Sequence, residues 1–87
     1  MNEFALRISS PDGDIFSGAA LRLSLRGAEG DLAVMAGHIP FATTVKAGKC
    51  RVLLPDGQEQ SFELESGLLT VGHDEATLLT GGSIADK

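Results

Sequence analysis

Apolar residues occupy every second position along much of this 87-residue chain. Residues 4–8 alternate Phe, Leu and Ile with Ala and Arg, and residues 21–26 alternate Leu with Arg or Ser. A spacing of two places the apolar side chains on one face of a strand, whereas a helix needs a spacing of three or four. Both segments are therefore predicted to be strands with one buried and one exposed face.

Turn signals separate the strand-like runs. Ser10–Gly13 and Pro55–Gln58 each contain Pro-Asp-Gly, which favours a tight reversal between two strands. Strand candidates follow roughly every eight to twelve residues and no window has a helical period, a pattern typical of a sandwich or barrel. The predicted fold is all-β, an antiparallel β-sandwich or flattened barrel of about eight to ten short strands. The predicted core consists of Leu6, Ile8, Leu21, Leu23, Leu25, Val34, Val52, Phe62, Leu64, Leu69 and Val71.

Length and charge bound what the chain can do. Its length fits one β-sandwich domain, predicted over residues 1–87, with residues 80–87 as a flexible tail. The net charge is −5 and the seven basic residues are scattered along the sequence. Nucleic acid is therefore not an expected partner, because phosphate binding requires clustered positive charge. No apolar run approaches the roughly 20 residues that span a bilayer, so direct membrane insertion is not expected.

The reactive side chains do not form a recognisable catalytic, cofactor-binding or metal-binding pattern. His38 has no orienting acid or second ligand at a suitable spacing, and residues 73–75, His-Asp-Glu, fit a polar turn. Cys50 lies between Lys49 and Arg51, whose charges favour a thiolate, but strand alternation points Cys50 inward as a small core residue. No glycine cluster is followed by the Gly-Lys-Ser or Gly-Lys-Thr of a phosphate loop. We therefore predict a protein that is not an enzyme, with no cofactor and no metal.

The stretch from residue 27 to residue 40 departs from simple alternation. Gly30 ends a Gly-Ala-Glu-Gly reversal that exposes Glu29, a buried strand follows, and a Gly-His pair turns the chain again. Pro40 lacks a backbone donor and holds the preceding residue extended. An exposed ion pair contributes only ~0 to 1 kcal/mol to folding. Glu29 and Asp31 are therefore better explained as groups that orient a partner protein.

Several short motifs occur together in one order and spacing. They are Ile15-Phe16-Ser17-Gly18, Glu29-Gly30-Asp31-Leu32, Gly37-His38 with Pro40, Val45-Lys46-Ala47-Gly48, Ser66-Gly67-Leu68-Leu69-Thr70-Val71 and Ala76-Thr77-Leu78-Leu79. In this arrangement the chain, from about Leu6 to Leu79, resembles the epsilon subunit of F-type ATP synthases, whose mitochondrial counterpart is delta. Ala36 and Ala47 stand where that family usually has proline, which affects the geometry of two loops rather than the fold.

The resemblance implies a role in the rotor of the synthase. It implies a non-catalytic central-stalk subunit that links the gamma subunit to the membrane c ring and so couples ion-driven rotation to ATP synthesis. It also implies a peripheral location, through the complex, at the cytoplasmic face of the bacterial inner membrane. The residues that it places against gamma and the c ring are Glu29, Gly30, Asp31, Gly37, His38 and Pro40.

The resemblance covers only the first part of a two-part design. Epsilon subunits continue into a C-terminal helical hairpin, and this sequence stops where the hairpin would begin. The chain is either one domain of a longer protein or a naturally short member, and the hairpin's regulatory role is not expected of these residues. The alternative function is a free-standing β-sandwich adaptor that binds a small ligand or another protein. A concave apolar pocket would favour the adaptor, and a broad face with exposed apolar residues would favour the stalk subunit.

Overall fold

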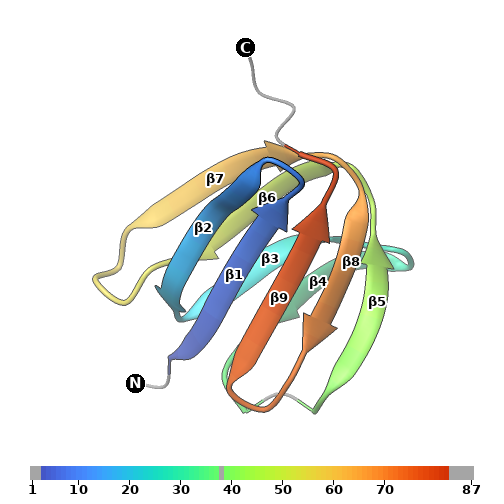
Figure 1. Cartoon of the computed structure of the whole chain (residues 1–87). Helices are drawn as coiled ribbons and strands as arrows, with labels where there is room; N and C mark the ends of the chain where they lie inside the picture. Colours follow the sequence, from blue (N-terminus) through green and yellow to red (C-terminus); the bar gives the residue numbers. More distant parts are fainter. Residues whose placement is uncertain (1–2, 38, 83–87) are drawn as a thin grey trace.

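The computed structural model describes residues 3–37 and 39–82, which form nine strands and no helix (Figure 1). Seven of the eight strand pairs described are antiparallel, which confirms the predicted all-β sandwich. The exception is β1 with β9, which pair in parallel. Parallel neighbours need a long crossover, and here β2 to β8 lie between them. The strands are β1 (Phe4–Ser10), β2 (Gly13–Ala20), β3 (Arg22–Gly27), β4 (Gly30–Val34), β5 (Phe41–Val45), β6 (Gly48–Leu53), β7 (Glu59–Leu64), β8 (Gly67–Val71) and β9 (Glu75–Thr80).

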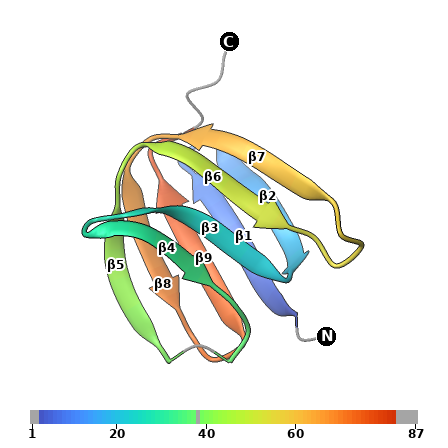
Figure 2. The same ribbon diagram turned by 180° about the vertical axis from the view of Figure 1, so that it is seen from behind.

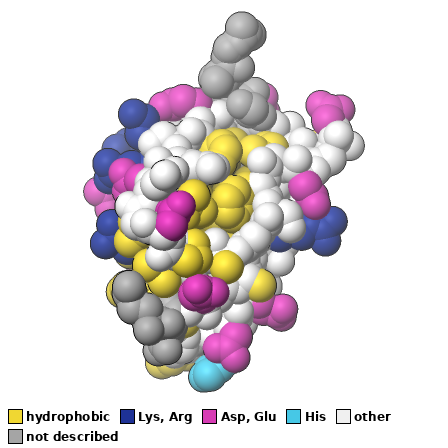
Figure 3. Space-filling model, turned by 90° about the vertical axis from the view of Figure 1, so that its left-hand side faces the viewer, with side chains coloured by type: hydrophobic (Ala, Val, Ile, Leu, Met, Phe, Trp, Pro, Cys, Tyr) yellow, Lys and Arg dark blue, Asp and Glu magenta, His cyan; other side chains and the backbone are white. Residues whose placement is uncertain are grey.

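The strands form one sheet that curls into two layers. The front layer, nearest the viewer in Figure 1, has the order β2-β1-β9-β8-β5, and the back layer, nearest the viewer in Figure 2, consists of β4, β3, β6 and β7. One pair, Gly27 with Val45, carries the sheet from β5 into β3. The hydrogen-bonded order of strands begins at β2 and ends at β7. Phe16 of β2 and Phe62 of β7 pack edge to face, with their ring centroids 6.2 Å apart. Figure 3 faces this side and shows apolar side chains gathered in its middle.

The core lies between the two layers. Nine of the eleven predicted core residues are buried there, because inward-facing positions alternate along each strand as expected. Leu21 is half-buried, since it lies at the bend between β2 and β3 and Ala20 takes the inward position. Phe62 is half-buried because it lies on the terminal strand β7. Cys50, predicted separately to point inward, is buried as well. The buried side chains that were not predicted are Phe4, Ala20, Val45, Ala76, Leu78 and Thr80.

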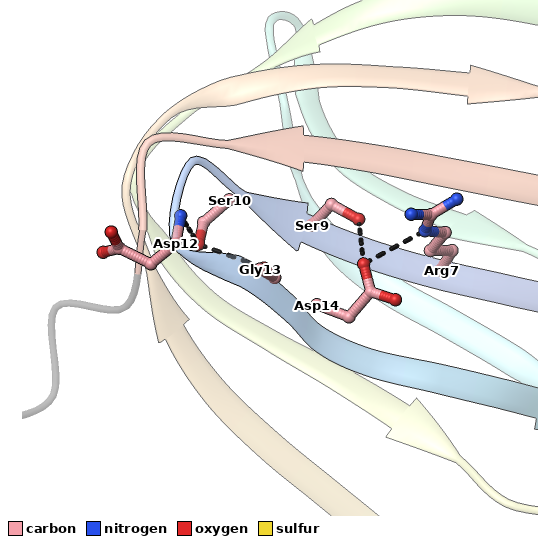
Figure 4. Close-up of polar contacts among 6 residues, drawn as sticks. All are labelled: Arg7, Ser9, Ser10, Asp12, Gly13 and Asp14. Atoms are coloured by element: carbon pink, nitrogen blue, oxygen red, sulfur yellow. Dashed lines mark hydrogen bonds and ion pairs between the residues drawn. The ribbon is translucent and has the colours of Figure 1, made fainter.

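The hairpin between β1 and β2 shows how short polar side chains define a turn (Figure 4). Gly13 adopts φ of 127°, a value that favours glycine. The Ser10 hydroxyl accepts a hydrogen bond from the Asp12 N–H and donates one to the Gly13 carbonyl. Beside the turn, Asp14 accepts hydrogen bonds from the Ser9 hydroxyl at 2.7 Å and from Arg7 Nε at 3.1 Å. These two hydrogen bonds lower the pKa of Asp14.

The last strand extends into the region that was predicted as a tail. Thr80 ends β9 and is buried, and its hydroxyl donates a hydrogen bond to the Glu65 carbonyl at 2.6 Å. The N–H of Gly81 also donates to the Ser66 carbonyl. Thr80 therefore belongs to the sheet, whereas the tail was predicted to begin at residue 80. The part of the predicted tail from residue 83 onward lies outside the described residues.

Candidate functional site

The turn between β3 and β4 carries the first group of predicted site residues. Gly27 pairs with Gly30, and Gly30 adopts φ of 130°, so the chain reverses within two intervening residues. Glu29 lies in that turn and is exposed. The predicted Gly-Ala-Glu-Gly reversal is confirmed, although only Gly30 of the two glycines has a positive φ.

Asp31 lies next to a cation of its own chain. Asp31 and Arg26 are register partners across β4 and β3, and Oδ1 of Asp31 lies 3.8 Å from Nε of Arg26. Their side chains are 92% and 65% exposed, so the pair is solvated and stabilises the fold little. A basic group on a partner protein would have to compete with Arg26 for this carboxylate.

The second group lies in the loop between β4 and β5. Gly37 adopts φ of 80° and donates its N–H to the His73 carbonyl at 3.0 Å, which ties the loop to the turn between β8 and β9. Met35 is 54% exposed and Ile39 is 77% exposed. Pro40 is exposed as well, and His38 lies outside the described residues. We name residues 35–37, 39, 40 and 72–74 the loop end.

The two groups lie at opposite ends of β4, as Figure 2 shows. Four steps along a strand separate Gly30 from Val34, a span of roughly 13 Å. The structure therefore brings Gly37 and Pro40 together in the loop end and places Glu29, Gly30 and Asp31 at the far turn. One partner surface reaches both groups only if it extends along the whole of β4.

The outer face of the front layer was not singled out from the sequence. Leu68 of β8 and Leu79 of β9 are register partners on this face, 42% and 52% exposed. Arg7 is one of its charged residues and is paired with Asp14. One sequence signal could have identified this face: β8 and β9 each carry a leucine at a position where alternation predicts an outward side chain. We name the outward side chains of this layer the front face: Ala5, Arg7, Ser9, Asp14, Ser17, Ala19, Ala42, Thr44, Leu68, Thr70, Glu75, Thr77 and Leu79.

Two open depressions lie on the outer faces of the layers. One, of about 500 Å³, lies over β3, β4 and β6, and the other, of about 600 Å³, lies over β1, β2 and β9. Both mix charged side chains with apolar ones. Within residues 3–37 and 39–82, no three His, Cys, Asp or Glu side chains are grouped as a metal site requires. The same residues include no helix long and apolar enough to cross a bilayer.

Cys50 is a core residue, as predicted. It is 2% exposed, and burial raises the pKa of its thiol to about 11. Lys49 and Arg51 point to the opposite face of β6 and are exposed. The thiol therefore stays protonated at neutral pH and is not an activated nucleophile.

Comparison with known proteins gives a family and a fold. The sequence profile of a family described as "ATP synthase, Delta/Epsilon chain, beta-sandwich domain" matches residues 3–85. A chain in the cryo-EM structure of the Euglena gracilis mitochondrial ATP synthase, with OSCP, F1 and c-ring, has TM-score 0.89 and 19% identity, covering 97% of this chain and 54% of that chain. A chain of the Tetrahymena thermophila mitochondrial ATP synthase central stalk and c-ring has TM-score 0.75 and 10% identity, covering 88% and 62%. This chain therefore spans less than two thirds of the length of either.

Proposed function

This chain belongs to the ATP synthase delta/epsilon chain family, by its β-sandwich domain, and we propose that it is a non-catalytic subunit of the rotating central stalk. In this role it links the gamma subunit to the c ring, so that ion-driven rotation of the ring is coupled to ATP synthesis. The observation that carries the proposal is the family match over residues 3–85. The two similar chains belong to mitochondrial assemblies that include the c-ring, which also supports it.

The front face is suited to the contact with gamma. A face formed by five adjacent strands presents mainly small, hydroxyl and apolar side chains. Leu68 and Leu79 form an exposed apolar centre on it, and exposed apolar groups of this kind mark protein interfaces. This is the surface expected of a stalk subunit rather than of a free-standing adaptor with a concave apolar pocket.

The loop end is suited to the contact with the c ring. Met35 and Ile39 project apolar side chains from a loop that the Gly37 hydrogen bond fixes against the β8–β9 turn. We assign Gly37, His38 and Pro40 to this contact. Glu29, Gly30 and Asp31, at the other end of β4, supply a second contact that sets the orientation of the domain.

ATP synthase is a membrane-associated complex, so the chain's association with the membrane is through protein. The proposal includes the finer location that the epsilon resemblance implies, the cytoplasmic face of the bacterial inner membrane. Fractionation of cells tests this part: the chain is expected in the membrane fraction and to leave it when the complex is stripped from the bilayer.

Copurification of the tagged chain with gamma from the same organism tests the stalk role. We expect a one-to-one complex at micromolar concentration for the wild type and for the Asp31→Arg and His38→Ala variants. Both variants are expected to assemble less well with the c ring. Glu59→Arg, which reverses an exposed acid of β7 outside the assigned contacts, is the matched control and should assemble normally. A correctly folded chain that does not bind gamma would exclude the proposal.

A further inference from the structure

The outer face of the back layer carries a basic depression that the gamma and c-ring contacts leave unexplained. The depression of about 500 Å³ is lined by Arg26, Lys49 and Arg51 and by one carboxylate, that of Asp31. Three cations thus surround one acid in a chain whose net charge is −5. Only Asp31 is shared with the contacts assigned above.

Strand pairing brings these cations together. Ser24 of β3 is the register partner of Arg51 of β6, and Arg26 and Lys49 lie two residues further along the same outward rows. The residues between these cations, Ser24, Ala33 and Gly48, are small. The surface is therefore recessed between the long side chains of the two arginines and the lysine. Figure 3 shows several Lys and Arg side chains along its left edge, on the side of the back layer, with acidic side chains among them. Residues up to 25 positions apart therefore form one positively charged surface.

The charge of Arg26 is available to a partner. Its ion pair with Asp31 is 3.8 Å long and solvated on both sides, and such pairs are weak and exchangeable. A guanidinium also binds a carboxylate through two parallel hydrogen bonds, a geometry that favours an incoming acid over a single distant contact. Glu63 of β7 is the register partner of Lys49 and lies on the same outward face. A second carboxylate therefore lies beside Lys49, at the edge of the depression rather than in its lining.

We propose that this depression binds an extended, carboxylate-rich segment of a partner protein. Lys49 and Arg51 lie two residues apart on one face of β6, a separation of about 6.6–6.8 Å. Alternate acidic side chains of an extended peptide have the same spacing, so two successive carboxylates can meet the two cations. This surface is distinct from the front face and the loop end, so the proposal does not depend on the stalk contacts.

The lining residues favour a polypeptide over other anions. The described residues around the depression include no aromatic side chain on which a base could stack, which disfavours single-stranded nucleic acid. The depression is open to solvent and its charged side chains are exposed, whereas sites for small anions enclose most of the ligand.

Fluorescence anisotropy with a labelled twelve-residue peptide of alternating Glu and Ser, at about 50 mM salt, tests the proposal. Lys49→Gln and Arg51→Gln should each weaken binding about 1.5- to 5-fold, the effect of one exposed charge pair. Asp31→Asn should tighten binding by a similar factor, because it removes the competing carboxylate. Substitution of Asp31 is thus expected to increase the peptide affinity but to impair assembly with the c ring. The two experiments can therefore refute one proposal without refuting the other.

Arg7→Gln is the matched control, since it removes an exposed arginine from the front layer, and it should leave the peptide affinity unchanged. If Arg7→Gln weakens peptide binding as much as the Lys49 and Arg51 variants do, the attraction is non-specific and the proposal is overturned. A double Lys49→Gln, Arg51→Gln variant with wild-type peptide affinity would also overturn it. Tighter binding of a twelve-nucleotide single-stranded DNA, or competition by inorganic phosphate at equal charge concentration, would overturn the assignment to a carboxylate-rich polypeptide.

Discussion

Leu68 and Leu79 allow the contact with gamma to be tested quantitatively. They face each other across β8 and β9 and are 42% and 52% exposed. Complete burial of a leucine side chain contributes about 1.5–3 kcal/mol. Covering the exposed fractions therefore contributes about 0.6–1.3 kcal/mol for Leu68 and about 0.8–1.6 kcal/mol for Leu79. If gamma covers both, the Leu68→Ala, Leu79→Ala double variant should bind gamma about 10- to 100-fold more weakly.

Titration calorimetry of the purified chain with gamma measures this difference. Met35→Ala is the matched control, because Met35 is 54% exposed but lies at the loop end, and its gamma affinity should equal that of the wild type. Thermal unfolding of each variant verifies that the fold is retained. A double variant with wild-type affinity, or a Met35→Ala variant with the larger loss, would refute the assignment of gamma to the front face.

Three further predictions concern the fold itself. Leu69 is fully buried, so Leu69→Ala should lower the free energy of unfolding by about 2–5 kcal/mol; denaturant titration measures this, and a loss below that of Leu79→Ala would contradict the assigned core. Because burial raises the pKa of Cys50 to about 11, the native thiol should resist a disulfide reagent at pH 8 and react only after unfolding; rapid labelling of the native protein would contradict this. The lowered pKa of Asp14 stabilises the fold above the unfolded-state pKa, and this contribution is lost as the pH falls through the folded-state pKa. Ser9→Ala and Arg7→Gln should each raise the pKa of Asp14, and carboxyl titration by NMR that shows no change in either variant would disprove the role of the two hydrogen bonds.

Much of the fold was predictable because strand alternation is a local property. The leucines at 23 and 25 and the inward position of Cys50 follow from a period of two, and the structure buries all three. Alternation fails where the chain bends between strands. At the β2–β3 bend Ala20 is buried instead of Leu21, and no periodic signal marks that shift.

The arrangement of distant segments was not predictable from a single sequence. The register partners of the parallel pair β1–β9, such as Ala5 and Glu75, are 70 residues apart in the sequence, and no local pattern indicates this pairing. The basic residues at 26, 49 and 51 are scattered in the sequence, and only the β3–β6 register gathers them. The predicted partner residues belong to two turns on either side of one strand in the sequence, and the length of β4 separates Glu29 from Pro40 in the structure.

Photo-crosslinking in the assembled synthase tests most directly whether the chain joins gamma to the c ring. Benzoylphenylalanine replaces Leu79 on the front face, Met35 at the loop end or, as a control, Glu59 on β7. The account predicts a crosslink from position 79 to gamma, one from position 35 to subunit c, and neither from position 59. Crosslinks from positions 79 and 35 to any other protein would contradict the account. Crosslinks from position 79 to subunit c and from position 35 to gamma would contradict it as well.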